Sequence, residues 1–383
     1  MSIGDIVLRD FIMYFEYVLG VIQKILLFIF ISFSTLSLIL IYVSTAWNSY
    51  LQYKDVFYVV KMQTCHLVFG CLILYWAIVM NYKKHCRYAR VLLLLNLTIL
   101  CVVYFTELGV KAGGAKRWLG YSFFRFQPGE LLKISLIYYL SFFLSRKYYF
   151  MQFFLYGLAE PIGFLLLSVS LLLLQPDFGT AVILFIIAFC MMFVSKARLE
   201  YVILCVFLSV LFFFHIAVTS NYRFVRLATA FNPWDYQKGA GYQILQSLTM
   251  IELGGYTGRM GGQSIFDLDT LPAAHTDFIL SVLGTYLGGG GILLVMCMYV
   301  VILIVGFYIA NFAVDNFSFY MLIGVTVLFA IQALFNICVV LGVFPTKGLT
   351  LPLLSYGGSS LFVNCWIIGT IYRGIGQLKA LYS

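Results

Sequence analysis

Charged residues are scarce in this chain, and their scarcity excludes the commonest class of protein. Only 10% of the 383 residues are Asp, Glu, Lys or Arg, whereas 63% are hydrophobic, and the mean hydropathy is +0.99. A soluble globular domain carries about 25% charged residues, so the composition is that of a polytopic membrane protein. The few Lys and Arg are scattered among short loops and form no basic domain, which argues against nucleic acid as a partner.

Patterns for metal and nucleotide binding are also missing. The histidines stand far apart and make no zinc-site spacing. None of the 9 cysteines lies in the long segment 220–289, where an oxidising compartment would favour a disulfide. The glycine-rich run 254–262 has no Gly-Lys-Ser/Thr ending and follows no strand, so we expect a flexible loop there and not a phosphate-binding loop.

Long apolar runs dominate what remains. Reading runs of roughly 17 to 25 apolar residues as membrane spans, we predict one all-α membrane domain over residues 1–383. Ten spans are expected near 25–46, 57–81, 90–108, 129–147, 158–174, 178–194, 199–219, 290–312, 319–343 and 353–373. Segment 220–289 is then a large outer loop. Residues 1–23 lack the basic start and cleavage site of a secretory signal, and we expect a short cytoplasmic interfacial helix there.

An even number of spans puts both termini on one side of the membrane. By the positive-inside rule that side is cytoplasmic, because its short loops are basic. These loops hold Lys83, Lys84, Arg87 and Arg90, then Arg146 and Lys147, then Lys196 and Arg198, and finally Arg373 and Lys379. The outer segments 111–125 and 220–289 are basic as well. Either an anionic ligand or incidental solvated charge would account for the outer cations.

One carboxylate stands at the mouth of a span. Asp277 ends the stretch Leu271-Pro272-Ala273-Ala274-His275-Thr276-Asp277-Phe278 and is followed by an apolar run to Leu283. An ionisable group at this place should face a cavity or the bundle interior, since facing lipid is costly. Asp277 is therefore a candidate for a functional site. The alternative is that Thr276 or Asp277 only caps a helix N-terminus.

The fourth span opens with a pair of opposite charges. Pro128 stands at the expected helix start. Glu130 and Lys133 follow three residues apart on one helix face, with the acid first, an order that favours an ion pair. Both would lie just below the outer surface, where such charges pair and line a polar cavity. A purely structural pair, or Lys133 reaching up to the surface, is the alternative.

Six motifs follow one another in a fixed order along the chain. They are Arg117-Trp118, Gln127-Pro128-Gly129-Glu130-Leu131-Leu132-Lys133, Gln175-Pro176-Asp177-Phe178-Gly179-Thr180, Gly241-Tyr242-Gln243 with Gln246-Ser247, the Asp277 stretch, and Pro345 through Ser360. In this order, on ten spans, they resemble the SEDS family of shape, elongation, division and sporulation proteins. Phe231-Asn232-Pro233-Trp234 and the stretch 345–352 resemble the division members more than the elongation members.

The resemblance implies a peptidoglycan glycosyltransferase that polymerises lipid II at the outer face of the bacterial cytoplasmic membrane. It implies a class B penicillin-binding transpeptidase and other membrane proteins of the division machinery as partners. The family's essential acid falls on Asp277. The residues that the resemblance implies for substrate binding are Arg117, Arg125, Gln127, Glu130 and Lys133.

Glycosyl transfer from a lipid pyrophosphate needs a base near the attacking hydroxyl and cations near the leaving phosphates. Asp277 can supply the base. Arg117, Arg125 and Lys133 can supply the cations, directly or through a divalent cation such as Mg or Mn. Whether Asp277 takes the proton or holds a metal stays open, and no other cofactor is expected.

The chain departs from the family pattern after Asp277. Where the family usually has Gly-Glu-Glu-Leu-Gly, the chain has Gly284-Thr285-Tyr286-Leu287-Gly288, so two acids are lost next to the expected cavity. The lost acids keep a non-catalytic role open, and, in all, three alternatives to a division polymerase stay open. A lipid II flippase would need polar groups reachable from both faces, a non-catalytic division scaffold would tolerate loss of Asp277, and an elongation polymerase would differ only in its role.

Overall fold

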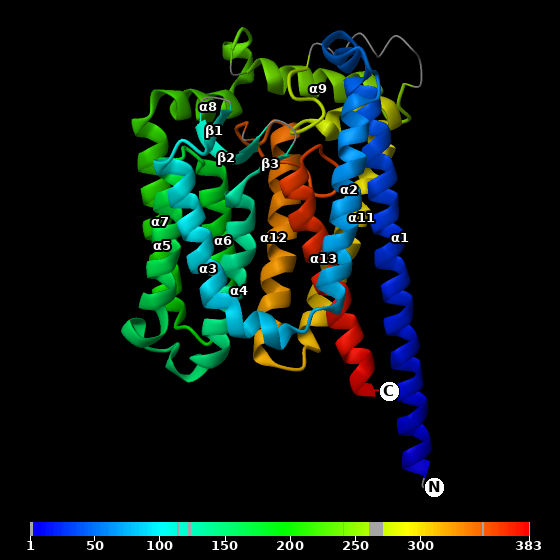
Figure 1. Ribbon diagram of the computed structural model, residues 1–383, viewed down its shortest axis with the longest axis vertical. Helices are drawn as coiled ribbons and strands as arrows, with labels where there is room; N and C mark the ends of the chain where they lie inside the picture. Colours follow the sequence, from blue (N-terminus) through cyan, green and yellow to red (C-terminus); the bar gives the residue numbers. More distant parts are fainter. Residues whose placement is uncertain are drawn as a thin grey trace.

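The computed structural model of the protein is a bundle of long helices (Figure 1). It describes residues 3–112, 115–121, 124–239, 241–259, 271–346 and 348–382. The long helices are α1 (Ile3–Tyr53), α2 (Tyr58–Val79), α3 (Tyr82–Phe105), α4 (Pro128–Arg146), α5 (Ala159–Leu174), α6 (Phe178–Val194), α7 (Leu199–Thr219), α11 (Ile279–Asn311), α12 (Asn316–Val340) and α13 (Gly358–Tyr382). Each predicted span corresponds to one of them, so the helical multi-pass fold is confirmed, and the one departure from an all-α chain is a small sheet between α3 and α4.

Not every helix of the bundle is apolar enough to cross a membrane alone. By length and hydropathy, 7 of the described helices qualify, and α4, α6 and α13 do not. Helix α4 carries Glu130 and Lys133, but both are buried inside the bundle. A helix that other helices surround needs no apolar face toward lipid. The bundle therefore includes α4 through packing and not through its hydropathy.

Short elements cover the end of the bundle opposite the two termini, which we call the capped end (Figure 1). Strands β1 (Gly109–Ala112), β2 (Ala115–Tyr121) and β3 (Phe124–Phe126) form an antiparallel sheet between α3 and α4. Helices α8 (Asn221–Phe231) and α9 (Tyr242–Gly254), with a 3-10 turn at Pro233–Tyr236, follow α7. Both termini lie at the other end, as the even number of spans predicts.

The N-terminal segment does not form a helix of its own. Helix α1 runs without a break for 51 residues, about 76 Å at 1.5 Å per residue. Beyond the predicted start of span one, Leu19 is fully buried, and the ring of Phe15 lies 5.6 Å from that of Phe312. The prediction of a separate interfacial helix is therefore wrong, because apolar packing against the end of α11 continues the first span.

Helix α11 begins well before the predicted position 290. It starts at Ile279 and is kinked at Gly288, where φ is 65°, a conformation that favours glycine. The preceding turn packs against the kink, since the N–H of Arg259 donates to the carbonyl of Thr285 at 2.9 Å. A Cβ on Gly258 would lie 2.1 Å from the carbonyl oxygen of Tyr286. The described part of the predicted flexible loop, up to residue 259, is thus tightly packed, and 260–262 lie outside the described residues.

Candidate functional site

Asp277 lies at the capped end, in the turn that leads into α11. The N–H groups of Thr276 and Asp277 donate to the carbonyl of Ala273 at 3.1 and 3.2 Å. Ala273 has φ of 60°, a strained conformation for a non-glycine residue of the kind that clusters at functional sites. The N-cap of α11 is Phe278, without a side-chain capping bond. In the described structure the carboxylate therefore does not serve as a helix cap.

Residues of α12 and of the last motif hold this turn by hydrogen bonds to its backbone carbonyls. The Asn336 side chain, on α12, donates from Nδ2 to the carbonyls of Asp277 and Leu349, at 2.8 and 2.7 Å. The N–H of Tyr356 donates to the carbonyl of His275 at 2.9 Å. These bonds fix the turn and use no atom of the Asp277 carboxylate. Asn336 was not among the predicted site residues, although an amide inside an apolar span was an available signal.

A cavity of about 510 Å³ opens beside Asp277. Its walls are the first turn of α6, the end of α7, helix α8, Gln243 of α9 and residues 345, 346, 348 and 349. The charged residues in the wall are Arg117, Asp177, Arg223, Arg226 and Asp277. Three guanidinium groups therefore share one cavity with two carboxylates, and this surplus of arginines suits an anionic ligand.

Backbone carbonyls position Arg117. From strand β2, its Nε donates to the carbonyl of Gln175 at 2.9 Å, and its Nη2 donates to that of Pro176. These bonds join the first motif of the sequence to the third. The predicted site residue Arg117 thus lies in the cavity wall, and its role in substrate binding stays a prediction.

Helix α8 supplies the other two cations. The Nη1 of Arg226 donates to the carbonyl of Thr346 at 2.8 Å, and the Arg223 guanidinium lies over the ring of Phe178, 5.5 Å from its centre. In the sequence these arginines were recognised only as part of a basic outer segment. Their spacing of three residues, which puts both on one face of a helix, was the signal that could have placed them at one site.

The cavity changes the acidity of Asp277, which precedes α11 and lies outside the membrane-spanning segments. Burial raises the pKa of Asp277 from 3.8 to about 7, and the charge of Arg226 works against that rise. A carboxyl group with a pKa near neutrality can accept and release a proton under working conditions. The environment therefore suits Asp277 for acid–base chemistry.

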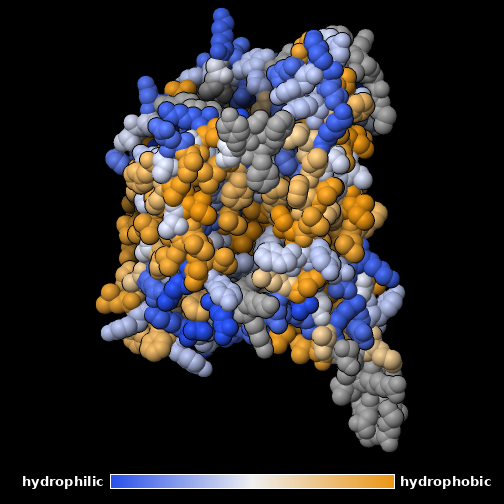
Figure 2. Space-filling model, in the orientation of Figure 1, coloured by the Kyte–Doolittle hydropathy of each residue, from blue (hydrophilic) through white to orange (hydrophobic). Residues whose placement is uncertain are grey.

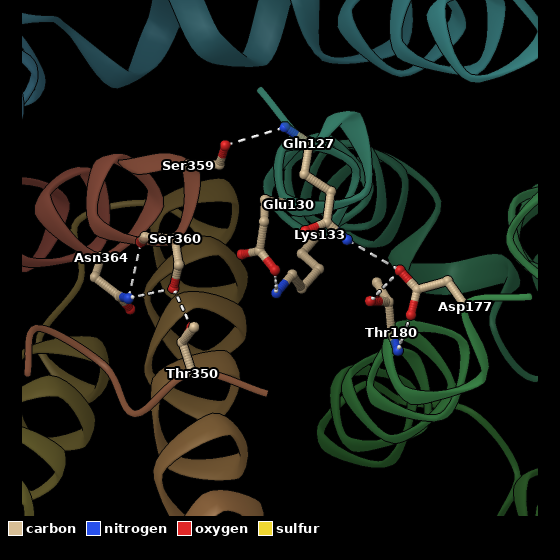
Figure 3. Close-up of polar contacts among 9 residues, drawn as sticks. All are labelled: Gln127, Glu130, Lys133, Asp177, Thr180, Thr350, Ser359, Ser360 and Asn364. Carbon is tan, nitrogen blue, oxygen red and sulfur yellow. Dashed lines mark hydrogen bonds and ion pairs between the residues drawn. The ribbon is translucent and has the colours of Figure 1, made fainter. Parts of the chain in front are cut away.

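Glu130 and Lys133 form the predicted buried ion pair. The Lys133 Nζ lies 2.6 Å from Glu130 Oε1, with 0% of the lysine side chain and 11% of the glutamate side chain exposed. Figure 3 shows the pair between Ser360 and Asn364 of α13 on one side and Asp177, the N-cap of α6, on the other. The predicted pair is confirmed. Within the described chain it lies behind the wall of the 510 Å³ cavity and not in it.

Gln127 connects this interior to the cavity wall. Its N–H donates to Ser359 Oγ at 3.0 Å, and its Nε2 donates to Asp177 Oδ2 at 3.2 Å (Figure 3). Asp177 also accepts from the N–H and the hydroxyl of Thr180, at 3.3 and 2.9 Å. Among the described residues, neither Gln127 nor Arg125, which is exposed on β3, lines the cavity. Their predicted contact with substrate stays untested.

The two positions that depart from the family pattern do not line the cavity. The Thr285 hydroxyl donates to the carbonyls of Met250 and Ser281, at 3.1 and 3.0 Å. Neither Thr285 nor Tyr286 is among the described residues that line the cavity. The expectation that the lost acids would lie next to it is therefore wrong, because this part of α11 packs against α9.

A second cavity, of about 470 Å³, lies between α2, α3, α4 and α13. Figure 2 shows a hollow with hydrophobic walls on this face of the bundle. Its lining is almost entirely apolar and includes Trp76, Phe126, Phe362 and Trp366. Ser359, which accepts the bond from Gln127, is one of its few polar residues. The apolar cavity thus begins beside the polar network that leads to Asp177.

The described residues offer few ligands for a divalent cation. The described parts of the chain contain no group of three His, Cys, Asp or Glu residues that could hold a metal ion. Asp177 already accepts three hydrogen bonds, which leaves Asp277 as the cavity carboxylate with free acceptor sites. Mg²⁺ is usually held by one or two carboxylates together with substrate phosphates and water, so Asp277 would be the protein ligand of such an ion. The Mg or Mn ion stays a prediction.

Comparisons with known proteins match nearly the whole chain. The family model for the FtsW, RodA and SpoVE cell cycle proteins matches residues 23–377. The probable peptidoglycan glycosyltransferase FtsW of Geobacter metallireducens is 33% identical over 355 residues, which cover 93% of this chain and 95% of the relative. The protein of the same name from Legionella pneumophila is 32% identical over 373 residues, which cover 97% and 93%.

Solved structures share the fold. A chain of a peptidoglycan synthase complex, studied for the coordination of polymerization and crosslinking, matches with a TM-score of 0.77 at 24% identity, over 92% of this chain and 97% of that one. The rod shape determining protein RodA of Thermus thermophilus matches with a TM-score of 0.67 at 23% identity, over 92% and 96%. With the family model matching residues 23–377, the chain belongs to the FtsW, RodA and SpoVE family of cell cycle proteins, the SEDS family.

Proposed function

We propose that this protein is a peptidoglycan glycosyltransferase that polymerises lipid II into glycan strands, with Asp277 as its catalytic base. The observation that carries the proposal is the placement of one carboxylate, free of any capping role, in a cavity with three arginines. Relatives that carry this activity in their names align over nearly the whole chain.

The residues support a single displacement step. Asp277 accepts the proton of the acceptor sugar hydroxyl while that oxygen bonds to the anomeric carbon of the donor. The bond from this carbon to the pyrophosphate oxygen breaks, and the electron pair leaves with the pyrophosphate. Arg117, Arg223 and Arg226 stabilise the negative charge that builds up on the leaving group.

The two cavities suit the two ends of a lipid-linked sugar. The arginine-lined cavity fits a charged head, and the apolar cavity between α2, α3, α4 and α13 fits part of a long hydrocarbon chain. Gln127 lies between them, bonded to Ser359 on one side and to Asp177 on the other. In this proposal the wall between the two cavities separates the charged head of the substrate from its hydrocarbon chain. The residues that stabilise this wall are Gln127, Glu130 and Lys133.

The relatives named FtsW favour a role in septal wall synthesis during cell division. A class B penicillin-binding transpeptidase is the proposed partner, because the fold matches a chain of a complex that coordinates polymerization with crosslinking. In this proposal the capped end faces outward and both termini are cytoplasmic. A flippase would need a polar path through both ends, whereas the cavity with Asp277 lies at the capped end.

Labelling with a membrane-impermeant maleimide tests this orientation. In a cysteine-free background, Tyr256→Cys at the capped end should react in intact spheroplasts, since the residue is 93% exposed. Tyr149→Cys, at a position 83% exposed between α4 and α5, is the matched control and should react only after permeabilisation. The reverse pattern would put the cavity in the cytoplasm and end the proposal.

The pH dependence of lipid II polymerisation, measured with purified protein and its partner, tests the catalytic role. The active base is the ionised carboxylate, so the rate should rise with pH through about 7 and then level off, given that burial raises the pKa of Asp277 to about 7. Arg226 lowers this pKa, so Arg226→Gln should move the midpoint to higher pH. Arg223→Gln, a loss of the same charge from the same wall, should move it less. An unchanged midpoint in Arg226→Gln, or lipid II translocation without polymer, would contradict the proposal.

A further inference from the structure

A groove of about 560 Å³ lies at the end of the bundle that carries the termini, far from Asp277. Its walls are residues 13–27 of α1 and the last turns of α13, which run side by side there (Figure 1). Lys379 of α13 lies across α1 at Gly20, where a Cβ would be 3.2 Å from the lysine Nζ. The glycine leaves room for the ammonium group inside the groove.

The groove holds an excess of positive charge. Lys24 and Lys379 both line it, with Glu16 as the one acid, and Gln23 and Tyr372 add neutral polar groups. In the part of the chain that the structure describes, neither lysine takes part in an ion pair. Two ammonium groups that form no ion pair with the described residues, in one concave site, can hold a phosphate between them.

Hydrocarbon-facing side chains continue the groove toward the bilayer. Leu27 lines it and is 37% exposed, and its neighbours Ile25 and Phe28 are 40% and 70% exposed. Lys24 immediately precedes this apolar stretch, so it lies where the span meets the headgroup layer. A lysine whose side chain only extends to water would not require a groove. A site for a small soluble anion would not require an apolar wall.

We propose that this groove binds an anionic phospholipid, with its phosphate between Lys24 and Lys379 and its acyl chains along Leu27. The lipid belongs to the leaflet on the side of the termini, which is the cytoplasmic leaflet in the orientation proposed above. Anionic lipids are attracted by lysines near that surface. Because α1 and α13 both contact the headgroup, the lipid joins the two ends of the chain, and its binding should stabilise the folded protein.

Thermal unfolding of the purified full-length protein in detergent tests the proposal. Phosphatidylglycerol should raise the midpoint of the wild type by on the order of 2–4 °C, and native mass spectrometry should show bound lipid. Phosphatidylcholine and inorganic phosphate should raise it much less. The double variant Lys24→Gln/Lys379→Gln should lose the shift. Lys61→Gln/Lys238→Gln, which removes two positive charges from the capped end, should keep it.

Three results would overturn the proposal. They are an equal phosphatidylglycerol shift in the groove variant and the wild type, an equal shift with inorganic phosphate, and an equal shift with phosphatidylcholine. The first result would show that the two lysines do not bind the lipid. The second would show that the groove binds any small anion. The third would show that lipid stabilises the protein without recognition of its headgroup charge. Should the double variant fail to fold, Lys24→Gln alone changes an exposed side chain and should still lower the bound lipid severalfold.

Discussion

Asp277→Asn is expected to lower the initial rate of lipid II polymerisation by about 10²–10⁴-fold, the usual contribution of a positioned base. The amide keeps the size of the side chain and removes its charge and basicity. The fold should survive, because the turn is held by backbone bonds to Ala273 and Asn336 and not by the carboxylate. Gel analysis of polymer formed by variant and wild type, at equal protein concentration, measures the effect.

Asp235→Asn is the matched control for this loss of charge. Asp235 lies in the same outer segment and is exposed, and its carboxylate accepts only a local bond from Asn232, at 2.8 Å. Its variant should polymerise at the wild-type rate. Asparagine is as good a helix cap as aspartate, so near-normal polymerisation by Asp277→Asn would restore the capping interpretation and remove the catalytic one.

Lys133→Ala is expected to lower the free energy of unfolding by about 3–5 kcal/mol, because it leaves Glu130 as a buried charge without its partner. The lysine side chain is 0% exposed and lies 2.6 Å from the glutamate. The double variant Glu130→Gln/Lys133→Met removes both charges and should recover much of the loss. Unfolding in mixed detergent micelles, followed by tryptophan fluorescence, measures the difference.

Lys61→Ala provides the comparison with an exposed pair. Lys61 and Asp55 are 2.7 Å apart with side chains 68% and 36% exposed, and such pairs contribute about 0–1 kcal/mol. If Lys133→Ala lost no more stability than Lys61→Ala, the ion pair inside α4 would not be the strong interior contact that its burial indicates.

The membrane architecture could be predicted from the sequence because hydropathy acts locally. Each span can be recognised from its own apolar run, and the six motifs lie in the loops and helix ends between the spans. The Glu130–Lys133 pair was predictable for the same reason, since spacing along one helix determines the contact. Both signals are local: the residues that form a span, and the two residues that form the ion pair, are close together in the sequence.

Features that depend on distant packing could not be predicted. The early start of α11 was hidden by the glycines after Leu287, where the helix kinks at Gly288 instead of ending. The continuous α1 depends on contacts with the far ends of α11 and α13, such as that between Phe15 and Phe312. The sheet formed by β1, β2 and β3 was not predicted, because its strands are short. They directly follow a predicted span, and the segment was interpreted only as an outer loop.

The site was only partly predictable for a similar reason. Asp277 and Arg117 stood out as polar residues at the mouths of spans, and both line the cavity. Arg223 and Arg226 enter it because α8 folds back over the bundle after α7. No local sequence pattern predicts that α8 folds back over the bundle, although each arginine could be recognised as a cation on the outer side.

The measurement that tests the central claim most directly is lipid II affinity beside polymerisation rate, on one preparation of Asp277→Asn. Binding depends on the three arginines and the apolar cavity, whereas Asp277 acts only as the new bond forms. The account predicts an affinity within a few-fold of wild type and a rate reduced by about 10²-fold or more. Loss of affinity and rate by the same factor would show that Asp277 binds the substrate without taking part in the reaction, and would contradict the account.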